Sequence, residues 1–234
     1  MKFLSSLSDA SKSTPNLVAR RLHEAIATGE LRPGDRLPPE IELAQGFGIA
    51  LMTVRVALGA LRDMGLLTTV RGRNGGNFVA ADVGLRLAEA ARRAPLSRAE
   101  LRDLTDWRRA ISGEACFLAA ERAGPEALTK IREAGKDFDR LLHQFPDLRF
   151  ADARFHSLIA EVSGSAALLR AETEIQLALT DVILAIDKPI GSRRLTAYTH
   201  DPIIEAISHG NGNAGREAMI RHAEDTFSWV TMLL

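Results

Sequence analysis

The sequence predicts a mainly α-helical protein in which a small winged helix-turn-helix domain precedes an all-α helical bundle. Two short helical patterns separated by a glycine, within residues 39–64, predict the helix-turn-helix. Two short runs of β-forming residues flank a glycine-rich stretch directly after it and predict a β-hairpin wing. From residue 82 onward, apolar residues recur at helical spacing and no strand pattern is found, which predicts the bundle.

The first domain is predicted to span residues 15–80, after a polar tail at residues 1–14 that we expect to be disordered. A helical pattern of apolar residues follows the tail, and Gly29 ends it. The next segment, RPGDRLPP, contains prolines and a glycine that exclude regular structure, and Pro39 suits the first turn of a second helix, EIELAQGF. Gly48 ends this second helix and provides the turn of a helix-turn-helix.

A third helix and a hairpin complete the first domain. The helix begins at about Leu51, keeps its apolar residues on one face and ends at Gly65. Two β-forming runs, LLTTV and NFVA, then flank the basic tip RGRNGG, which is a hairpin pattern. A helix-turn-helix with a hairpin appended is a winged helix.

Charge and geometry together make the first domain a candidate DNA-binding module. The whole chain holds 30 basic and 30 acidic residues, but residues 1–80 hold ten basic and seven acidic ones. The third helix can enter a major groove, and Arg71 and Arg73 in the hairpin tip can approach a phosphate backbone or the minor groove. The alternative is a protein-interaction module, because small helical domains with hairpins also serve that purpose and an arginine at a loop tip is usually only solvated.

Residues 84–234 are predicted to form an all-α domain that is joined to the first near residues 80–84. Ser97 and Glu100 have the spacing of a capping box, and Pro125 suits the first turn of the helix that follows. The predicted helices span residues 83–93, 98–123, 126–144, 148–163, 165–186, 193–209 and 213–233.

Cysteine content and hydropathy indicate a cytoplasmic protein. Cys116 is the single cysteine, so no disulfide can form within one chain, which fits a reducing compartment. The first residues lack the apolar core and small-residue cleavage site of a signal peptide. No uncharged apolar run is long enough to span a bilayer, so we expect no membrane partner.

The sequence resembles the GntR family of bacterial transcription regulators, and within it the FadR-type branch with an all-helical ligand domain, the FCD domain. The resemblance covers nearly the whole chain after the polar tail, and the order and spacing of its motifs are specific. The segments that carry it are GELRPGDRLPPEIELAQGFGI, TVRVALGALRDMGLL, RGRNGGNFV, WRRAISGEACFLAAERA, DARFHSLIAEVSGSAALL and HDPIIEAISHGNGNAGREAMIRH.

The resemblance implies a homodimer that binds a palindromic double-stranded operator under the control of a small molecule in the helical domain. Half-sites about one helical turn of DNA apart, roughly 34 Å, are the geometric consequence of such symmetry. Family members commonly have arginine where this chain has Ile41 and Leu51, and Arg55 keeps the third of these arginines. We therefore expect either a different operator or a greater reliance on Arg55, Thr53 and the wing for reading it.

Four residues of the helical domain form a candidate metal site. Asp152 and His156 are four positions apart on one helix, and His200 and His222 lie on later helices. Imidazole nitrogen and carboxylate oxygen bind first-row divalent metals, and facing helices of a bundle can bring such groups together. By residue type alone each histidine is more often a core or surface group. The resemblance favours the metal site, because metal-binding members of the branch use these four positions.

Three imidazoles and one carboxylate suit zinc or nickel first, with manganese or iron as alternatives. A small carboxylate effector could complete the coordination of the ion. Arg108 or Arg109 could then bind the same carboxylate, although adjacent helical residues point apart and at least one of the two is expected to be a solvated charge. The remaining histidines are interpreted as structural or solvated: His23, His143 and His209.

Three functions compete on this basis. The leading hypothesis is a transcription regulator whose operator affinity is controlled by a small organic acid bound at or near the metal. The second is a metal sensor, in which the ion itself is the signal. The third is a metal-dependent hydrolase, which is disfavoured because no general base accompanies the metal ligands as it does in H-E-x-x-H. We therefore expect no enzymatic activity.

Overall fold

The computed structural model describes residues 15–73, 75–93, 96–186 and 199–233. The polar tail for which the sequence predicts disorder, residues 1–14, lies outside this described part. The chain divides into two compact units, Met1–Leu87 and Ala88–Leu234.

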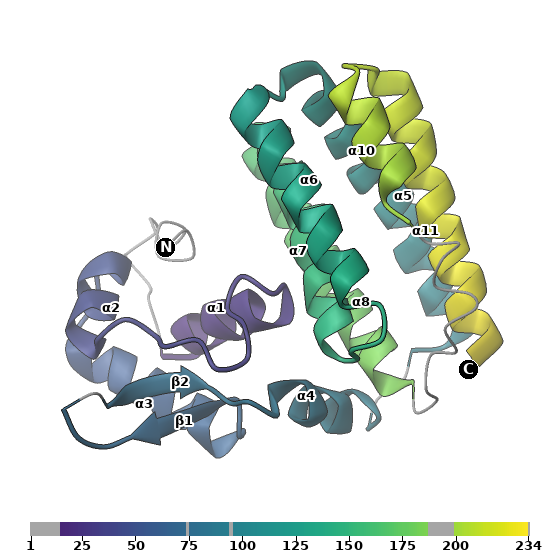
Figure 1. Ribbon diagram of the computed structural model, residues 1–234. Helices are drawn as coiled ribbons and strands as arrows, with labels where there is room; N and C mark the ends of the chain where they lie inside the picture. Colours follow the sequence, from purple (N-terminus) through teal and green to yellow (C-terminus); the bar gives the residue numbers. More distant parts are fainter. Residues whose placement is uncertain (1–14, 74, 94–95, 187–198, 234) are drawn as a thin grey trace. The chain divides into compact units, whose positions relative to one another are not determined.

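The described part of the first unit contains three whole helices, a two-stranded sheet and the start of a fourth helix (Figure 1). The strands pair antiparallel, so that Leu67 lies opposite Val79 and Val70 lies opposite Gly76. In chain order the elements are α1 (Pro15–Ala27), α2 (Glu40–Phe47), α3 (Leu51–Asp63), β1 (Leu67–Val70) and β2 (Gly76–Val79). The sequence-predicted winged helix-turn-helix is therefore confirmed.

The turn between α2 and α3 depends on one glycine. Gly48 has φ 66°, a left-handed conformation that side chains with a Cβ rarely adopt, and its N–H bonds the last carbonyls of α2. Three residues later α3 begins, and the chain direction has turned by 113°. The apolar face of α3, which includes Val54, Leu58 and Leu61, is buried where α3 packs on α1. That burial fixes which face of α3 stays in solvent.

The hairpin tip also needs glycine at one position. A Cβ on Gly75 would lie 2.3 Å from the carbonyl oxygen of Val70, so no larger residue fits there. The Gly75 carbonyl accepts a hydrogen bond of 2.6 Å from Arg36, which ties the tip to the segment before α2. One side of the tip is thus fixed while Arg71 and Arg73 stay exposed.

The regular elements in the rest of the described chain are all helices. The elements are α4 (Val83–Ala91), α5 (Arg98–Arg122), α6 (Pro125–Arg140), α7 (Asp147–Val162), α8 (Ala166–Ala185), α10 (Asp201–Ser208) and α11 (Gly212–Leu233). In the second unit α5 packs along α11, while α7 lies against α5, α6 and α8. Figure 1 shows α6, α10 and α11 as neighbouring rods of the bundle.

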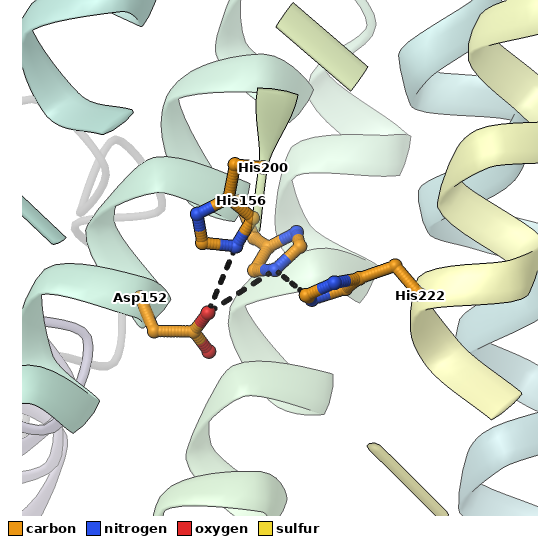
Figure 2. A group of neighbouring side chains, drawn as sticks. All are labelled: Asp152, His156, His200 and His222. Atoms are coloured by element: carbon orange, nitrogen blue, oxygen red, sulfur yellow. Dashed lines mark hydrogen bonds and ion pairs between the residues drawn. The ribbon is translucent and has the colours of Figure 1, made fainter. Parts of the chain in front are cut away.

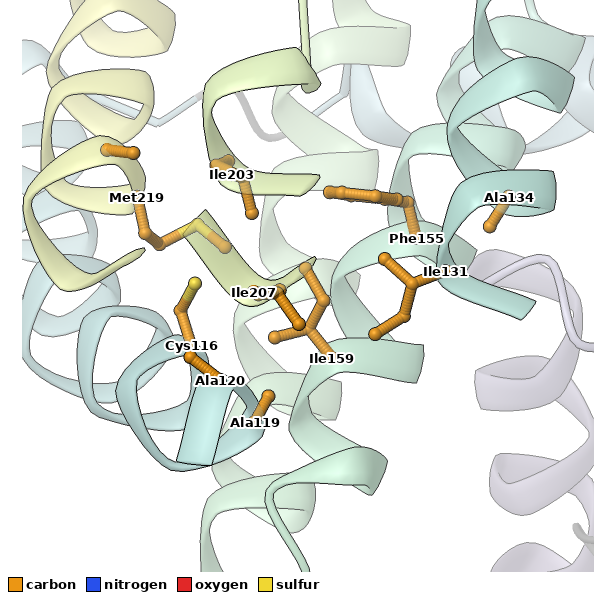
Figure 3. Close-up of a cluster of buried hydrophobic side chains, with 11 residues drawn as sticks. Cys116, Ala119, Ala120, Ile131, Ala134, Phe155, Ile159, Ile203, Ile207 and Met219 are labelled. Atoms are coloured by element: carbon orange, nitrogen blue, oxygen red, sulfur yellow. The ribbon is translucent and has the colours of Figure 1, made fainter. Parts of the chain in front are cut away.

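The core of the second unit is built where these helices meet. One apolar cluster joins α5, α6, α7, α10 and α11, and Figure 3 shows Phe155, Ile159 and Ile207 within it. A second cluster joins α5, α8 and α11 around Ile175 and Val230. Cys116 is fully buried in the first cluster, and burial raises the pKa of its thiol to about 12, so it is no thiolate nucleophile at neutral pH.

The predicted helices are found with small shifts at their ends. Ser97 and Glu100 form the expected capping box, in which the Glu100 N–H donates to Ser97 Oγ at 3.2 Å and the Ser97 N–H donates to the Glu100 carboxylate at 2.8 Å. The helix predicted at residues 126–144 ends at Arg140. The one predicted at 193–209 begins at Asp201 in the described part, because Pro202 can occupy only the first turn of a helix; its predicted residues 193–198 lie outside that part.

Within the described ranges, no single helix is both long enough and apolar enough to cross a membrane. Only α2 and α3 taken together reach the required length and composition, and they are the two bent helices of the helix-turn-helix.

Candidate functional site

Four side chains from three helices converge inside the second unit. Asp152 and His156 project from one face of α7, His200 precedes the first turn of α10, and His222 comes from α11 (Figure 2). One nitrogen or oxygen atom from each lies within 4.8 Å of the others. These are the four residues in which the sequence predicts metal ligands.

The spacing of the four atoms matches that of ligands around one ion. The Oδ1 atom of Asp152 lies 3.1 Å from His200 Nε2 and 3.6 Å from His156 Nε2. The Nε2 atoms of His156 and His222 are 3.2 Å apart. An ion with bonds of about 2.0–2.2 Å places neighbouring ligand atoms roughly 3.0–3.5 Å apart. Two of the three separations lie in this range and the third just above it, so the four groups could hold one first-row ion.

Hydrogen bonding leaves part of this cluster without partners. Within the described residues, Nε2 and Nδ1 of His200 and Nδ1 of His156 are buried and accept or donate no hydrogen bond. His200 Nε2 is close to the Asp152 carboxylate, but the two groups do not meet in hydrogen-bond geometry. Since buried polar atoms nearly always have well-aligned partners, the poor alignment of His200 Nε2 with the Asp152 carboxylate supports an ion at the centre of the cluster.

Protonation states at neutral pH suit metal binding. Burial lowers the pKa of His156 to about 3 and holds the pKa of His222 well below its usual range. Burial would raise the pKa of Asp152, but its interactions with His156 and Arg149 outweigh this and hold that pKa well below its usual range. Both imidazoles therefore keep a lone pair available and the carboxylate is ionised, as a metal ligand set requires.

Aromatic side chains position His200, the N-cap of α10, whose carbonyl accepts the Ile204 N–H at 2.9 Å. Its ring stacks on Phe155 with centroids 4.0 Å apart. Phe138 of α6 meets it edge-on at 4.4 Å. Because Phe155 directly precedes His156 on α7, the same helix supplies two ligands and the platform for a third.

Sequence reasoning missed a buried polar chain behind Asp152. Arg149 donates to Asp152 Oδ2 and, at 2.5 Å, to the side-chain oxygen of Gln176 on α8. Gln176 donates to Glu172 at 2.7 Å, and Ser112 of α5 donates to the other Glu172 oxygen at 2.6 Å. The available signal was spacing, since Arg149 is three residues before Asp152 and Glu172 is four before Gln176 within helical patterns.

Replacing Arg149 by methionine is expected to weaken metal binding about 10- to 100-fold, because Asp152 loses the group that orients it. Competition with a chromophoric chelator measures the metal dissociation constant. Arg154→Met is the matched control, because Arg154 lies on the same helix and pairs with Asp137 at 3.0 Å. Equal metal affinity in the two variants would show that Asp152 needs no help from Arg149.

The structure separates the two arginines for which an effector role was predicted. Arg108 is buried, with one guanidinium nitrogen 3.1 Å from His156 Nε2 and another donating to Thr226 Oγ1 at 3.1 Å. Within the described residues no carboxylate lies at ion-pair distance from it; burial lowers its pKa, and the Asp152 and Glu172 carboxylates act in the opposite direction. Arg109 is half-exposed, pairs with Asp106 and Glu224, and lies outside the four-residue cluster.

The predicted DNA-contacting residues lie on two elements of the first unit. Thr53 is half-buried near the start of α3, and Arg55, further along the same helix, is 53% exposed. Arg55 Nε donates to the Glu40 carboxylate at 2.9 Å, an exposed pair that contributes little stability. Arg71 and Arg73 are exposed between β1 and β2. All four are therefore within the helix-turn-helix and wing.

Two protein families match the two parts of the chain. Residues 15–76 match the family described as bacterial regulatory proteins, gntR family. Residues 103–225 match the family described as FCD domain. The first match covers the predicted DNA-contacting residues, and the second covers the four-residue cluster.

Similar proteins are described as transcription regulators. The putative HTH-type transcriptional regulator RmpR of Mycobacterium gastri is 31% identical over 88% of this chain and 76% of its own length. The putative L-lactate dehydrogenase operon regulatory protein of Escherichia coli is 30% identical over 88% of this chain and 81% of its own.

Solved structures support the fold. Escherichia coli McbR/YncC has a TM-score of 0.58 at 16% identity, with 94% of this chain and 98% of that one covered. A putative GntR transcriptional regulator from Rhodococcus sp. RHA1 has a TM-score of 0.53 at 21% identity, with the same coverage.

Proposed function

Because the chain belongs to the GntR family of bacterial transcription regulators and carries an FCD domain, we propose that a small organic acid bound at a divalent metal controls its affinity for operator DNA. Like its relatives, which are transcription regulators, the protein is a DNA-binding regulator and not an enzyme. The metal, the acid and the homodimer that binds a palindromic operator are the proposed parts.

Asp152, His156, His200 and His222 would hold the ion. Three imidazoles and a carboxylate suit zinc or nickel, and manganese or iron are alternatives. When bound, the ion supplies an electrophilic position that a carboxylate oxygen can occupy. Arg149 orients Asp152, and Phe155 packs against the His200 ring.

The observation that carries the proposal is the position of Arg108. Its guanidinium lies 3.1 Å from His156 Nε2, where it can donate to the lone pair of that nitrogen. An imidazole nitrogen that binds a metal has no lone pair left for this hydrogen bond. Metal binding thus leaves a buried guanidinium without that acceptor, and a carboxylate on the effector is the group that would satisfy it.

The size of the acid is suggested by a relative. One similar protein is named for an L-lactate dehydrogenase operon, and lactate is a small hydroxy acid. Such a molecule offers one carboxylate that the ion and Arg108 could share. We therefore propose a short hydroxy or keto acid as the effector.

On the DNA side, we assign contacts to Thr53 and Arg55 on α3 and to Arg71 and Arg73 in the wing. Arg55 is an exposed cation in the first half of the helix that would enter the major groove, whereas Arg62 near its end donates to Asn77, so Arg55 is the residue for direct base contact. The wing arginines suit phosphates or the minor groove. Because bacterial operator DNA lies in the cytoplasm, we assign the protein to that compartment.

The test is fluorescence anisotropy with duplex DNA that flanks the gene of this protein, at moderate salt, with metal-loaded protein and a panel of short hydroxy and keto acids. One acid is expected to shift the operator dissociation constant about fivefold or more. Arg108→Met should bind operator and metal but lose the acid response, while Arg55→Ala should lose roughly tenfold in operator affinity.

Three outcomes would change the proposal. A response to metal alone, with no acid effect, would make the protein a metal sensor. An unchanged acid response in Arg108→Met would remove this residue from the effector site. An absence of sequence-preferring binding, with Arg55→Ala equal to wild type, would overturn the assignment of the DNA-contacting residues.

A further inference from the structure

Large apolar side chains are exposed on the same part of the helix-turn-helix that carries Arg55. Ile41 in the first turn of α2 is 61% exposed, and Met52 and Val56 on α3 are 64% and 51% exposed. These residues do not belong to the core of the unit, which α3 contacts through its opposite face. A small domain gains nothing in stability from leaving three such side chains in water.

The exposed side chains lie close together around the turn of the motif. Met52 and Val56 are four residues apart and share one face of α3. Ile41 follows Glu40, which receives the hydrogen bond from Arg55, so the first turn of α2 adjoins that face. Ile41 and Leu51 also line one open hollow of about 430 Å³ beside the turn. We call Ile41, Met52 and Val56 the apolar reading face.

The charges around the apolar reading face indicate a polyanion as its partner. Arg55 lies on it, and Arg71 and Arg73 of the same unit are exposed in the wing. A second protein chain with an apolar patch would have to desolvate Arg55, whereas a DNA groove offers it base acceptors with phosphates on both sides. The family membership of this unit points to the same partner.

We propose that the apolar reading face recognises thymine through its C5 methyl group, so that each operator half-site carries thymines beside the base pair bound by Arg55. This inference rests on the proposed DNA-binding role and specifies the bases that are read. Aliphatic and thioether side chains have no donor for guanine, and the thymine methyl is the apolar group that the major groove presents. Reading would then combine one guanidinium contact with several methyl contacts per half-site.

The experiment begins with in vitro selection of duplexes from a random pool by the full-length protein. Each thymine of the selected half-site is then replaced singly by deoxyuridine, which deletes the methyl and keeps the base pair. Loss of one contacted methyl is expected to weaken binding about fourfold. At one position of the half-site, Met52→Ala should no longer distinguish thymine from deoxyuridine. At another position, Ile41→Arg should change the selected base towards guanine.

Met64→Ala is the matched control, since Met64 is 58% exposed at the other end of α3 and should keep full thymine discrimination. If the selection yields no preferred sequence, the proposed DNA-binding role fails and not only this inference. If a sequence is selected but deoxyuridine has no effect at any position, the inference about thymine is wrong and the proposed DNA-binding role is retained. The inference is equally wrong if Met52→Ala alters self-association instead of base preference.

Discussion

His156→Ala is expected to abolish stoichiometric metal binding while the first unit stays folded. The Nε2 atom of His156 is the central one of the cluster, 3.6 Å from the Asp152 oxygen and 3.2 Å from His222 Nε2. Its removal leaves one carboxylate and two imidazoles. Three donors bind an ion with lower affinity than four, so the ion should be lost during purification. Inductively coupled plasma mass spectrometry of protein purified without chelator measures the bound metal.

The control for this substitution is His209→Ala. His209 is an exposed histidine at the end of α10 that bonds the Glu205 carbonyl at 2.9 Å and lies outside the cluster. It should keep the wild-type metal content. Operator binding of His156→Ala in the absence of effector should also stay near the wild-type value. Full metal occupancy in His156→Ala would contradict the assignment of the site.

Phe155→Ala is expected to lower the free energy of unfolding of the second unit by about 3–5 kcal/mol. The side chain is fully buried in the cluster of Figure 3, so its removal takes away apolar contacts and leaves a cavity. The ring also stacks on His200, so metal affinity should fall together with stability. Urea unfolding followed by circular dichroism measures the stability, and chelator competition measures the affinity.

A graded variant separates the two effects of Phe155. Phe155→Leu restores much of the lost volume but not the flat surface against His200, so it should recover more stability than metal affinity. If stability and metal affinity recover in parallel, the Phe155 ring contributes only to core packing and does not position His200. A loss below about 1 kcal/mol in Phe155→Ala would contradict its central place in the cluster.

The elements of the fold could be predicted because their signals are local. Gly48 adopts the left-handed conformation that ends α2, and the capping box at Ser97 sets the start of α5. These signals need only neighbours in sequence. The end of α6 is less well predicted, because helical periodicity continues to residue 144 while the helix itself ends at Arg140.

The candidate site could be predicted only in part. Spacing alone joins Asp152 to His156, since both lie on one helical face. His200 and His222 reach them through the packing of α10 and α11, which no local pattern encodes, and only the family resemblance indicated them. The buried position of Arg149 was missed for the same reason, because its partners come from α8.

The apolar reading face shows a similar limit in the first unit. The sequence indicated that Ile41 stands where relatives commonly have arginine. It could not indicate that this side chain would be exposed next to Arg55, because exposure depends on how α2 and α3 cross. Only the structure shows that this departure from the family pattern contributes to an exposed apolar surface.

Arg108 is a buried cation held by a hydroxyl and an imidazole, and no carboxylate pairs with it within the described residues. The Asp152 and Glu172 carboxylates offset only part of the cost of burying this cation, since burial still lowers its pKa, so a fold optimised for stability alone would place an apolar side chain there. In the ligand-free protein, Arg108 therefore lowers the stability of the fold in exchange for its role in effector binding. Release of an effector would return the protein to a less stable state, so a change in protease resistance would accompany its signal.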